Sequence, residues 1–235
     1  MKRTCLLCSK YLVEEINFSS LFSLSKVQQE CLCTECRLKF ISLDKSACCT
    51  GCGRVWLETW CTDCQRWHQS NPDIPLAHSA LYEYNDWMKE WMEQFKFKGD
   101  YRLANVFSIE IKKQFTGKQL KNLLIVPIPI SFESYQLRGF NQVEALLDFA
   151  GIPYHSLLEN QNLEKKQSTK NRQERLRMEQ PFILKDSHSF DLAKYADKSV
   201  VLVDDVYTTG RTILHAKKLI LELGLTLEKS LSIAR

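Results

Sequence analysis

The chain has 235 residues, 44% of them hydrophobic and 26% charged, which suits one or two globular domains with a real core. Its formal net charge of +4 is too mild to indicate a nucleic-acid ligand by itself. The longest apolar run, residues 123–130, contains two prolines, so we expect no integral membrane segment. The N-terminus lacks the apolar stretch of a signal peptide, which favours a cytoplasmic location.

All ten cysteines lie within the first 64 residues. Eight of them form Cys-x-x-Cys pairs: Cys5/Cys8, Cys33/Cys36, Cys49/Cys52 and Cys61/Cys64. Such closely spaced thiols suit tetrahedral coordination of zinc better than disulfides or a thioredoxin-like redox pair. Pairing in sequence order predicts two sites, the first from Cys5, Cys8, Cys33 and Cys36 and the second from Cys49, Cys52, Cys61 and Cys64.

The two predicted sites differ in the length of the loop that each must close. Eight residues separate the two pairs of the second site, whereas 24 residues separate those of the first. The sequence therefore leaves open whether the chain binds one zinc ion or two. Cys31 and Cys48 stand outside the pattern and are expected to be spare or buried thiols. A site with four thiolates is closed, so we expect zinc to be structural and not catalytic.

The cysteine-rich segment is predicted to form a double zinc ribbon over residues 1–68, and a turn-rich linker separates it from a second domain over residues 76–235. We expect a strand at residues 78–84, followed by a helix that is capped by Asn85 or Asp86 and ended by Gly99. The apolar stripe of this helix favours core packing over a base-stacking surface; it comprises Trp87, Met88, Trp91, Met92 and Phe95.

Strands then alternate with helices. After a second helix at residues 101–115, we expect strands at 123–126, 200–203 and 230–233 and helices at 140–150 and 209–223. This order predicts an α/β fold with a parallel sheet wound by helices. Ligands of such sheets bind beyond the carboxyl ends of the strands, so the loops after residues 126 and 203 should open on the same edge.

Residues 200–212 are the most informative segment of the chain. A buried strand is followed by Asp204 and Asp205, and then by a Thr/Gly turn that leads into a helix. Paired carboxylates can accept hydrogen bonds from vicinal hydroxyls, while N–H groups at a helix N-terminus favour a phosphate. A phosphorylated sugar is therefore the expected ligand, and its phosphate is expected at Thr208, Thr209, Gly210, Arg211 and Thr212. The backbone N–H of Arg211 suffices for this, and its side chain either adds charge or points to solvent.

Two basic segments accompany this motif. Arg138 lies between the Pro-x-Pro loop and the helix at 140–150 and is a candidate contact for a pyrophosphate or for DNA phosphates. Residues 164–177 contain six basic and two acidic residues without a clear apolar period. This second segment is either a solvated surface loop or a flap that brings Arg172 and Arg175 to a pyrophosphate or to DNA phosphates.

The segment 200–212 resembles the phosphoribosyl pyrophosphate (PRPP) motif of type I phosphoribosyltransferases. In that family the two acids hold the ribose 2′- and 3′-hydroxyls and the Thr/Gly turn holds the 5-phosphate. The whole order of motifs is similar to the ComF family of late competence proteins: the Cys-x-x-Cys pairs, Phe95-Lys-Phe-Lys-Gly-Asp100, Val126-Pro-Ile-Pro129, Arg138-Gly-Phe-Asn-Gln142, the Arg-rich segment and the PRPP-type motif.

The ComF resemblance implies a zinc ribbon fused to a type I phosphoribosyltransferase domain. It also implies the handling of single-stranded DNA entering the cytosol, beside a ComFA-type ATP-driven translocase at the membrane-associated uptake machinery. Three hypotheses remain open: a transferase that uses PRPP and Mg²⁺ on an unknown acceptor, a module that grips nucleotide or DNA phosphates, and a scaffold for the translocase. A hood over the site is expected from residues 78–98 or from the zinc module.

Overall fold

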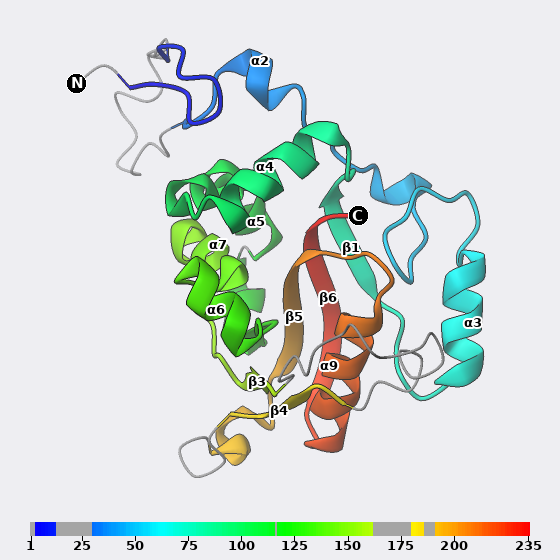
Figure 1. Ribbon diagram of the computed structural model, residues 1–235. Coiled ribbons are helices and arrows are strands. Elements are labelled where there is room, and N and C mark those ends of the chain that lie inside the picture. Colours follow the sequence, from blue (N-terminus) through cyan, green and yellow to red (C-terminus); the bar gives the residue numbers. More distant parts are fainter. Residues whose placement is uncertain (1–2, 13–29, 116, 162–179, 186–190) are drawn as a thin grey trace, which may run out of the picture.

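The computed structural model describes residues 3–12, 30–115, 117–161, 180–185 and 191–235 (Figure 1). These residues form an α/β fold around a four-stranded parallel sheet of order β1-β6-β5-β2. Its strands are β1 His78–Tyr82, β2 Leu123–Pro127, β5 Ser199–Val206 and β6 Thr226–Ala234. The parallel sheet flanked by helices confirms the predicted fold class, and the carboxyl ends of β2 and β5 meet at one edge as expected.

Two strands are longer than the sequence pattern indicated. Strand β5 continues beyond Val203 through both acids, because Asp204 pairs with Ser232 and Val206 pairs with Ala234. Strand β6 begins at Thr226 because it lies between β1 and β5 and forms ladders with both. Pairing with neighbouring strands, and not local apolar character, therefore sets the length of each strand.

Helices cover both faces of the sheet (Figure 1). One face carries α4 Asp86–Phe97, α5 Ser108–Gln114 and α7 Gln142–Ala150, and the other carries α9 Arg211–Glu222. The Asn85 side chain caps α4 by accepting a hydrogen bond from the backbone N–H of Met88. Asn141 caps α7 in the same way, so this helix begins two residues later than predicted, and α9 begins at Arg211 instead of Thr209.

The predicted helix at residues 101–115 is wrong in its first half. A 3₁₀ helix, η2 Tyr101–Phe107, precedes the α-helix α5. With three residues per turn, the 3₁₀ segment aligns Leu103 with Val106 and Ala104 with Phe107, and all four are buried.

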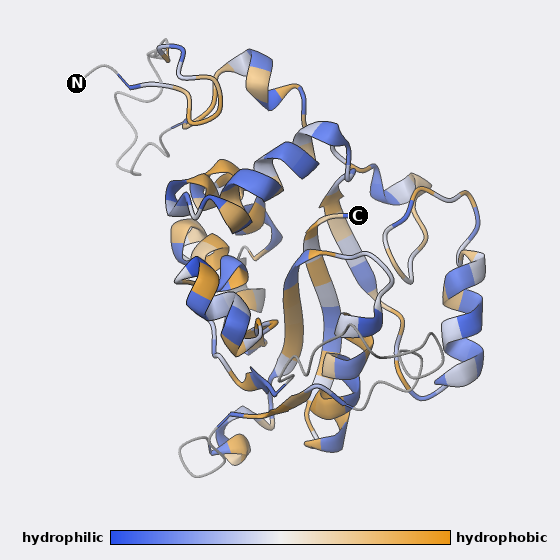
Figure 2. Cartoon of the chain, viewed as in Figure 1, coloured by the Kyte–Doolittle hydropathy of each residue, from blue (hydrophilic) through white to orange (hydrophobic). Residues whose placement is uncertain are grey.

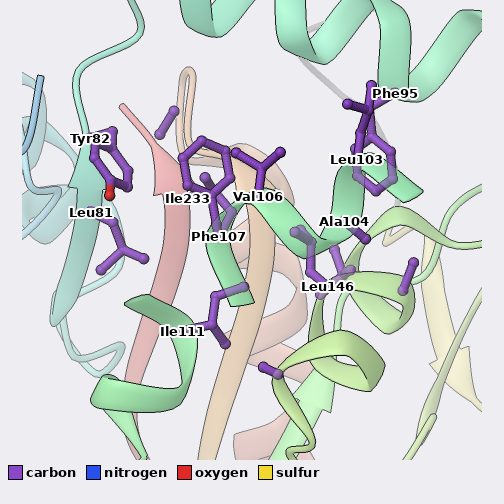
Figure 3. Close-up of a cluster of buried hydrophobic side chains, with 14 of the residues drawn as sticks. Leu81, Tyr82, Phe95, Leu103, Ala104, Val106, Phe107, Ile111, Leu146 and Ile233 are labelled. Carbon is purple, nitrogen blue, oxygen red and sulfur yellow. The ribbon is translucent and has the colours of Figure 1, made fainter. Parts of the chain in front are cut away.

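The core has two parts, one on each face of the sheet. Val201 and Val203 of β5 face the part that contains α4 and α5, whereas Val200 and Leu202 face the part that contains α9. Figure 3 shows the first part, in which Phe95, Phe107 and Leu146 come from helices and Ile233 from β6. Figure 2 shows β5 in mostly hydrophobic colours and α3 in mostly hydrophilic ones.

The stripe of α4 is confirmed as core. Met88, Trp91, Met92 and Phe95 are at most 4% exposed. Trp87 is 43% exposed and lies under the Lys39 ammonium group, which is 3.4 Å from the centre of its ring. The base-stacking alternative is thus excluded for four of the five residues.

Several elements were not predicted. Strands β3 Leu158–Asn160 and β4 Phe182–Leu184 form an antiparallel pair on either side of the basic segment in the chain, and residues 162–179, which include that segment, lie outside the described part. The other additional elements are α2 Thr34–Arg37, α3 Thr62–Ser70, α6 Phe132–Arg138, η1 Lys45–Ala47, η3 Gly117–Asn122 and η5 Leu192–Tyr195. Among the described helices, none has the length and apolar character that a membrane span requires.

Candidate functional site

The paired acids lie at the carboxyl end of β5. Asp205 Oδ2 is 2.7 Å from Nζ of Lys96, which lies in the last turn of α4. The two side chains are only 12% and 18% exposed, so their charges are held largely away from water. The sequence pattern of residues 95–100 does not predict a role for Lys96. The contact with Asp205 shows that this lysine neutralises an acid of the candidate site.

The surroundings of Asp204 disfavour its charged form. Burial and the neighbouring charge of Asp205 raise the pKa of Asp204 to about 7, against the lowering effects of the Asp205 backbone N–H and of Lys96. The Asp205 N–H donates to Asp204 Oδ1 at 2.9 Å. One carboxylate is therefore paired with a lysine, while the other exchanges its proton near neutral pH.

The turn between β5 and α9 has a backbone that demands glycine. Gly210 is the N-cap of α9 with φ of +81°, and a Cβ there would collide with the Tyr207 hydroxyl. Thr208, Thr209 and Thr212 are exposed around this helix N-terminus. Within the described residues, the N–H groups of Thr208, Thr209 and Gly210 donate no hydrogen bond. The turn thus offers free donors where a helix dipole favours an anion.

Arg138 approaches the same edge from α6. Its guanidinium carbon lies 5.6 Å from the centre of the Phe97 ring at the end of α4, and its Nη1 donates to Gln142 Oε1 at 2.9 Å. Its buried Nε has no hydrogen-bond partner among the described residues. Arg172 and Arg175, the other predicted phosphate contacts, lie outside the described residues.

Eight cysteines assemble into two groups, and the sulfur atoms of each group lie within 4.8 Å of one another. We call Cys5, Cys8, Cys33 and Cys36 the first cluster and Cys49, Cys52, Cys61 and Cys64 the second cluster. These groups follow the sequential pairing, including the 24-residue loop of the first cluster. Cys31 and Cys48 belong to neither group, and burial raises the pKa of the Cys31 thiol to about 11.

Both clusters can hold a metal ion, and four sulfur ligands fit zinc. In the second cluster, hydrogen bonds from the Cys64 thiol, the Arg54 backbone and Arg235 lower the pKa of Cys52 to about 4 despite its burial. A Cβ at Gly51 would lie 2.8 Å from Cys64 Sγ, so the knuckle has room for glycine alone. The lowered pKa of Cys52 favours its thiolate form before a metal ion binds.

The second cluster touches the turn of the candidate site through residues that sequence reasoning missed. Arg235 Nη2 donates to Cys52 Sγ at 3.6 Å, and its Nη1 donates to the carbonyl oxygens of Tyr207, at 3.2 Å, and of Thr208. The Trp67 indole N–H donates to the Thr209 carbonyl at 3.2 Å. No local pattern could reveal contacts between residues so far apart in the chain.

Comparisons with known proteins agree with this architecture. Residues 157–233 match the phosphoribosyl transferase domain family. The competence protein ComFC of Streptococcus pneumoniae (strain ATCC BAA-255 / R6) is 38% identical over 231 residues, 98% of this chain and 99% of that protein. Competence protein ComFC of Bacillus subtilis (strain 168) is 34% identical over 227 residues, 95% of this chain and 90% of that protein. The chain therefore belongs to the ComFC family of competence proteins.

Proposed function

We propose that this protein binds a phosphoribose ligand at the carboxyl edge of its sheet and uses that site while assisting the uptake of single-stranded DNA in natural transformation. The observation that carries the proposal is the joint position of the two acids and the open Thr/Gly turn at the end of β5, in a chain of a competence family. The ligand is PRPP or a nucleotide phosphate.

Each part of the edge has a distinct role in this proposal. Asp204 and Asp205 accept hydrogen bonds from the ribose hydroxyls, and Lys96 balances the charge of Asp205 when no ligand is bound. The backbone N–H groups and hydroxyls that hold the 5-phosphate belong to Thr208, Thr209, Gly210, Arg211 and Thr212. Arg138, Arg172 and Arg175 contact a pyrophosphate or DNA phosphates, and Mg²⁺ accompanies PRPP.

Zinc is the proposed occupant of both clusters, where it stabilises the residues 1–68 and does no chemistry. The proposed partner for DNA delivery is a ComFA-type ATP-driven translocase, which would recruit this protein from the cytoplasm to the uptake machinery. The boundary between a zinc ribbon at 1–68 and a phosphoribosyltransferase-like domain at 76–235 is part of the same proposal.

The ligand site is tested by the melting temperature with and without PRPP and Mg²⁺. A ligand at one hundred times its Kd adds about 2.7 kcal/mol of stability, so the wild type should show a clear upward shift. Asp205→Asn should lose the shift. Asp197→Asn should keep it, because this exposed residue precedes the amino end of β5. A wild type without any shift at millimolar PRPP contradicts a phosphoribose site.

DNA binding is tested by fluorescence anisotropy with a labelled single strand. Phosphate contacts make affinity fall steeply between about 50 and 200 mM salt. Arg138→Ala, Arg172→Ala and Arg175→Ala should each weaken binding, and Lys185→Ala outside the proposed site should not. Equal affinity in all variants would remove these arginines from the DNA interface.

The intact acids and turn also favour a second candidate, a phosphoribosyltransferase that uses PRPP and Mg²⁺. In such a reaction the C1–O bond to pyrophosphate breaks as an acceptor bonds to C1, and positioning and charge supply most of the rate. Release of pyrophosphate that depends on single-stranded DNA or a nucleobase would support the transferase. PRPP that stays intact while it changes DNA affinity would favour a binding site.

A further inference from the structure

The second cluster and the candidate phosphate turn meet around one arginine. Arg235 follows β6, and its backbone is fixed on both sides: its N–H donates to the Tyr82 carbonyl and its own carbonyl accepts from the Tyr84 N–H, each at 3.0 Å. Its guanidinium carbon lies 4.8 Å from the centre of the Tyr207 ring, which packs against His78. The guanidinium group is thus fixed in position relative to the sheet.

Three successive carbonyl groups of the turn between β5 and α9 point toward Arg235 or Trp67. Arg235 binds the carbonyl oxygens of Tyr207 and Thr208, and Trp67 of α3 binds that of Thr209. In a planar trans peptide, the N–H of the next residue points opposite to the carbonyl. Fixing these carbonyls therefore turns the N–H groups of Thr208, Thr209 and Gly210 away from Arg235, and these are the donors proposed for the phosphate.

Arg235 also binds the second cluster. Its other terminal nitrogen lies 3.6 Å from Cys52 Sγ, and the guanidinium fork has a rigid, planar geometry. When Cys52 is a metal-bound thiolate, the same arginine holds both the sulfur and the turn. The first cluster offers a contrast within the chain, because its described charged neighbours pair elsewhere: Lys10 with Glu35, and Arg37 with Glu30 and Glu110.

We propose that Arg235 is a positioning residue that transmits the metal-bound state of the second cluster to the phosphate turn, so that metal and phosphate ligand stabilise each other. The idea rests on the proposed phosphoribose site for its ligand, but the ordering of the turn does not depend on ligand identity. Reciprocity is required by thermodynamics: if zinc raises the affinity for PRPP by some factor, PRPP must raise the affinity for that zinc by the same factor.

The test uses the full chain loaded with zinc and compares wild type, Arg235→Gln, Arg235→Lys and Arg54→Gln. Arg54 is a matched control, because it pairs with Asp63 beside the second cluster, at 2.7 Å, and no described contact joins it to the turn. Zinc stoichiometry and melting temperature establish that each variant is folded. Arg235→Lys retains the charge but loses the fork.

Three readouts then follow: hydrogen exchange of the backbone amides of residues 207–211 without ligand, calorimetric affinity for PRPP with Mg²⁺, and zinc affinity from equilibrium competition with a chromophoric chelator, with and without PRPP. We expect Arg235→Gln and Arg235→Lys to retain both zinc ions, to exchange the turn amides faster and to bind PRPP roughly tenfold more weakly. In wild type and Arg54→Gln, PRPP should protect one zinc ion of two from the chelator at equilibrium, and this protection should vanish in both Arg235 variants.

The outcomes separate the two proposals. Wild-type exchange rates and PRPP affinity in folded Arg235→Gln would overturn the positioning role while leaving the phosphoribose site intact. Faster turn exchange in Arg235→Gln, together with no PRPP binding by wild type, would support the positioning role and reject the phosphoribose ligand. Equal protection of both zinc ions by PRPP, or of neither, would overturn the coupling to the second cluster.

Discussion

The two cysteine clusters have the same ligand composition in very different surroundings. Every cysteine of the second cluster is at most 1% exposed, and the cluster packs with β5 and α9 in one part of the core. In the first cluster Cys8 is exposed, and a hollow between this cluster and α4 is lined by Cys8, Cys36 and Trp87. The two clusters therefore differ in burial and position and not in ligand type.

The comparison predicts a large difference between matched substitutions, Cys61→Ser and Cys8→Ser. Cys61 is completely buried beside the sheet, so its loss should remove a metal ion and lower the free energy of unfolding by more than about 4 kcal/mol. Cys8→Ser should cost less, about 1 kcal/mol, because Cys8 itself is exposed and its cluster is only partly buried. Urea unfolding with zinc analysis measures both, and similar losses would contradict the distinction.

The α4 side of the edge depends on a charge pair instead of a metal. Lys96→Met leaves Asp205 buried without its partner, so we expect a loss of about 3 kcal/mol. Adding Asp205→Asn should restore most of that loss, and Lys98→Met on the exposed neighbour should have little effect. Thermal denaturation of Lys96→Met, Asp205→Asn, the double variant and Lys98→Met gives the coupling energy of the pair. If the effects of Lys96→Met and Asp205→Asn on stability simply add in the double variant, the two residues are not coupled.

A smaller effect concerns pH. The folded-state pKa of Asp204 is about 7, above its ordinary value of 3.8, so folding is favoured by the protonated form and that stability is lost as pH rises through 7. Asp204→Asn removes this loss, and should be more stable than wild type by about 1–2 kcal/mol at pH 8, with a smaller difference at pH 5. Melting temperatures across this range provide the check, and a difference independent of pH would contradict the assignment.

Sequence patterns were sufficient where the signal is local. The strand, the acids and the glycine turn of residues 199–210 follow from consecutive residues, and Cys-x-x-Cys spacing predicted both clusters. The contacts of Lys96 with Asp205, of Trp67 with Thr209 and of Arg235 with Cys52 each join residues more than a hundred positions apart, so only the folded chain brings them to the site. The 3₁₀ segment before α5 escaped prediction because the spacing of its buried residues also fits one face of an α-helix.

The central position of β6 has a consequence for how this protein folds. Within the sheet formed by the described residues, β1 pairs with β6 alone, and His78 of β1 contacts Ser230 of β6 across 152 residues of chain. Closing so long a loop is slow, and an unpaired β1 edge is exposed until it happens. The second cluster is attached to the start of β1 through the His78 N–H and the Thr50 carbonyl. A metal ion bound early by the second cluster would hold the start of β1 in place. The pairing of β6 with β1 would then be the later step that brings Arg235 to the turn between β5 and α9.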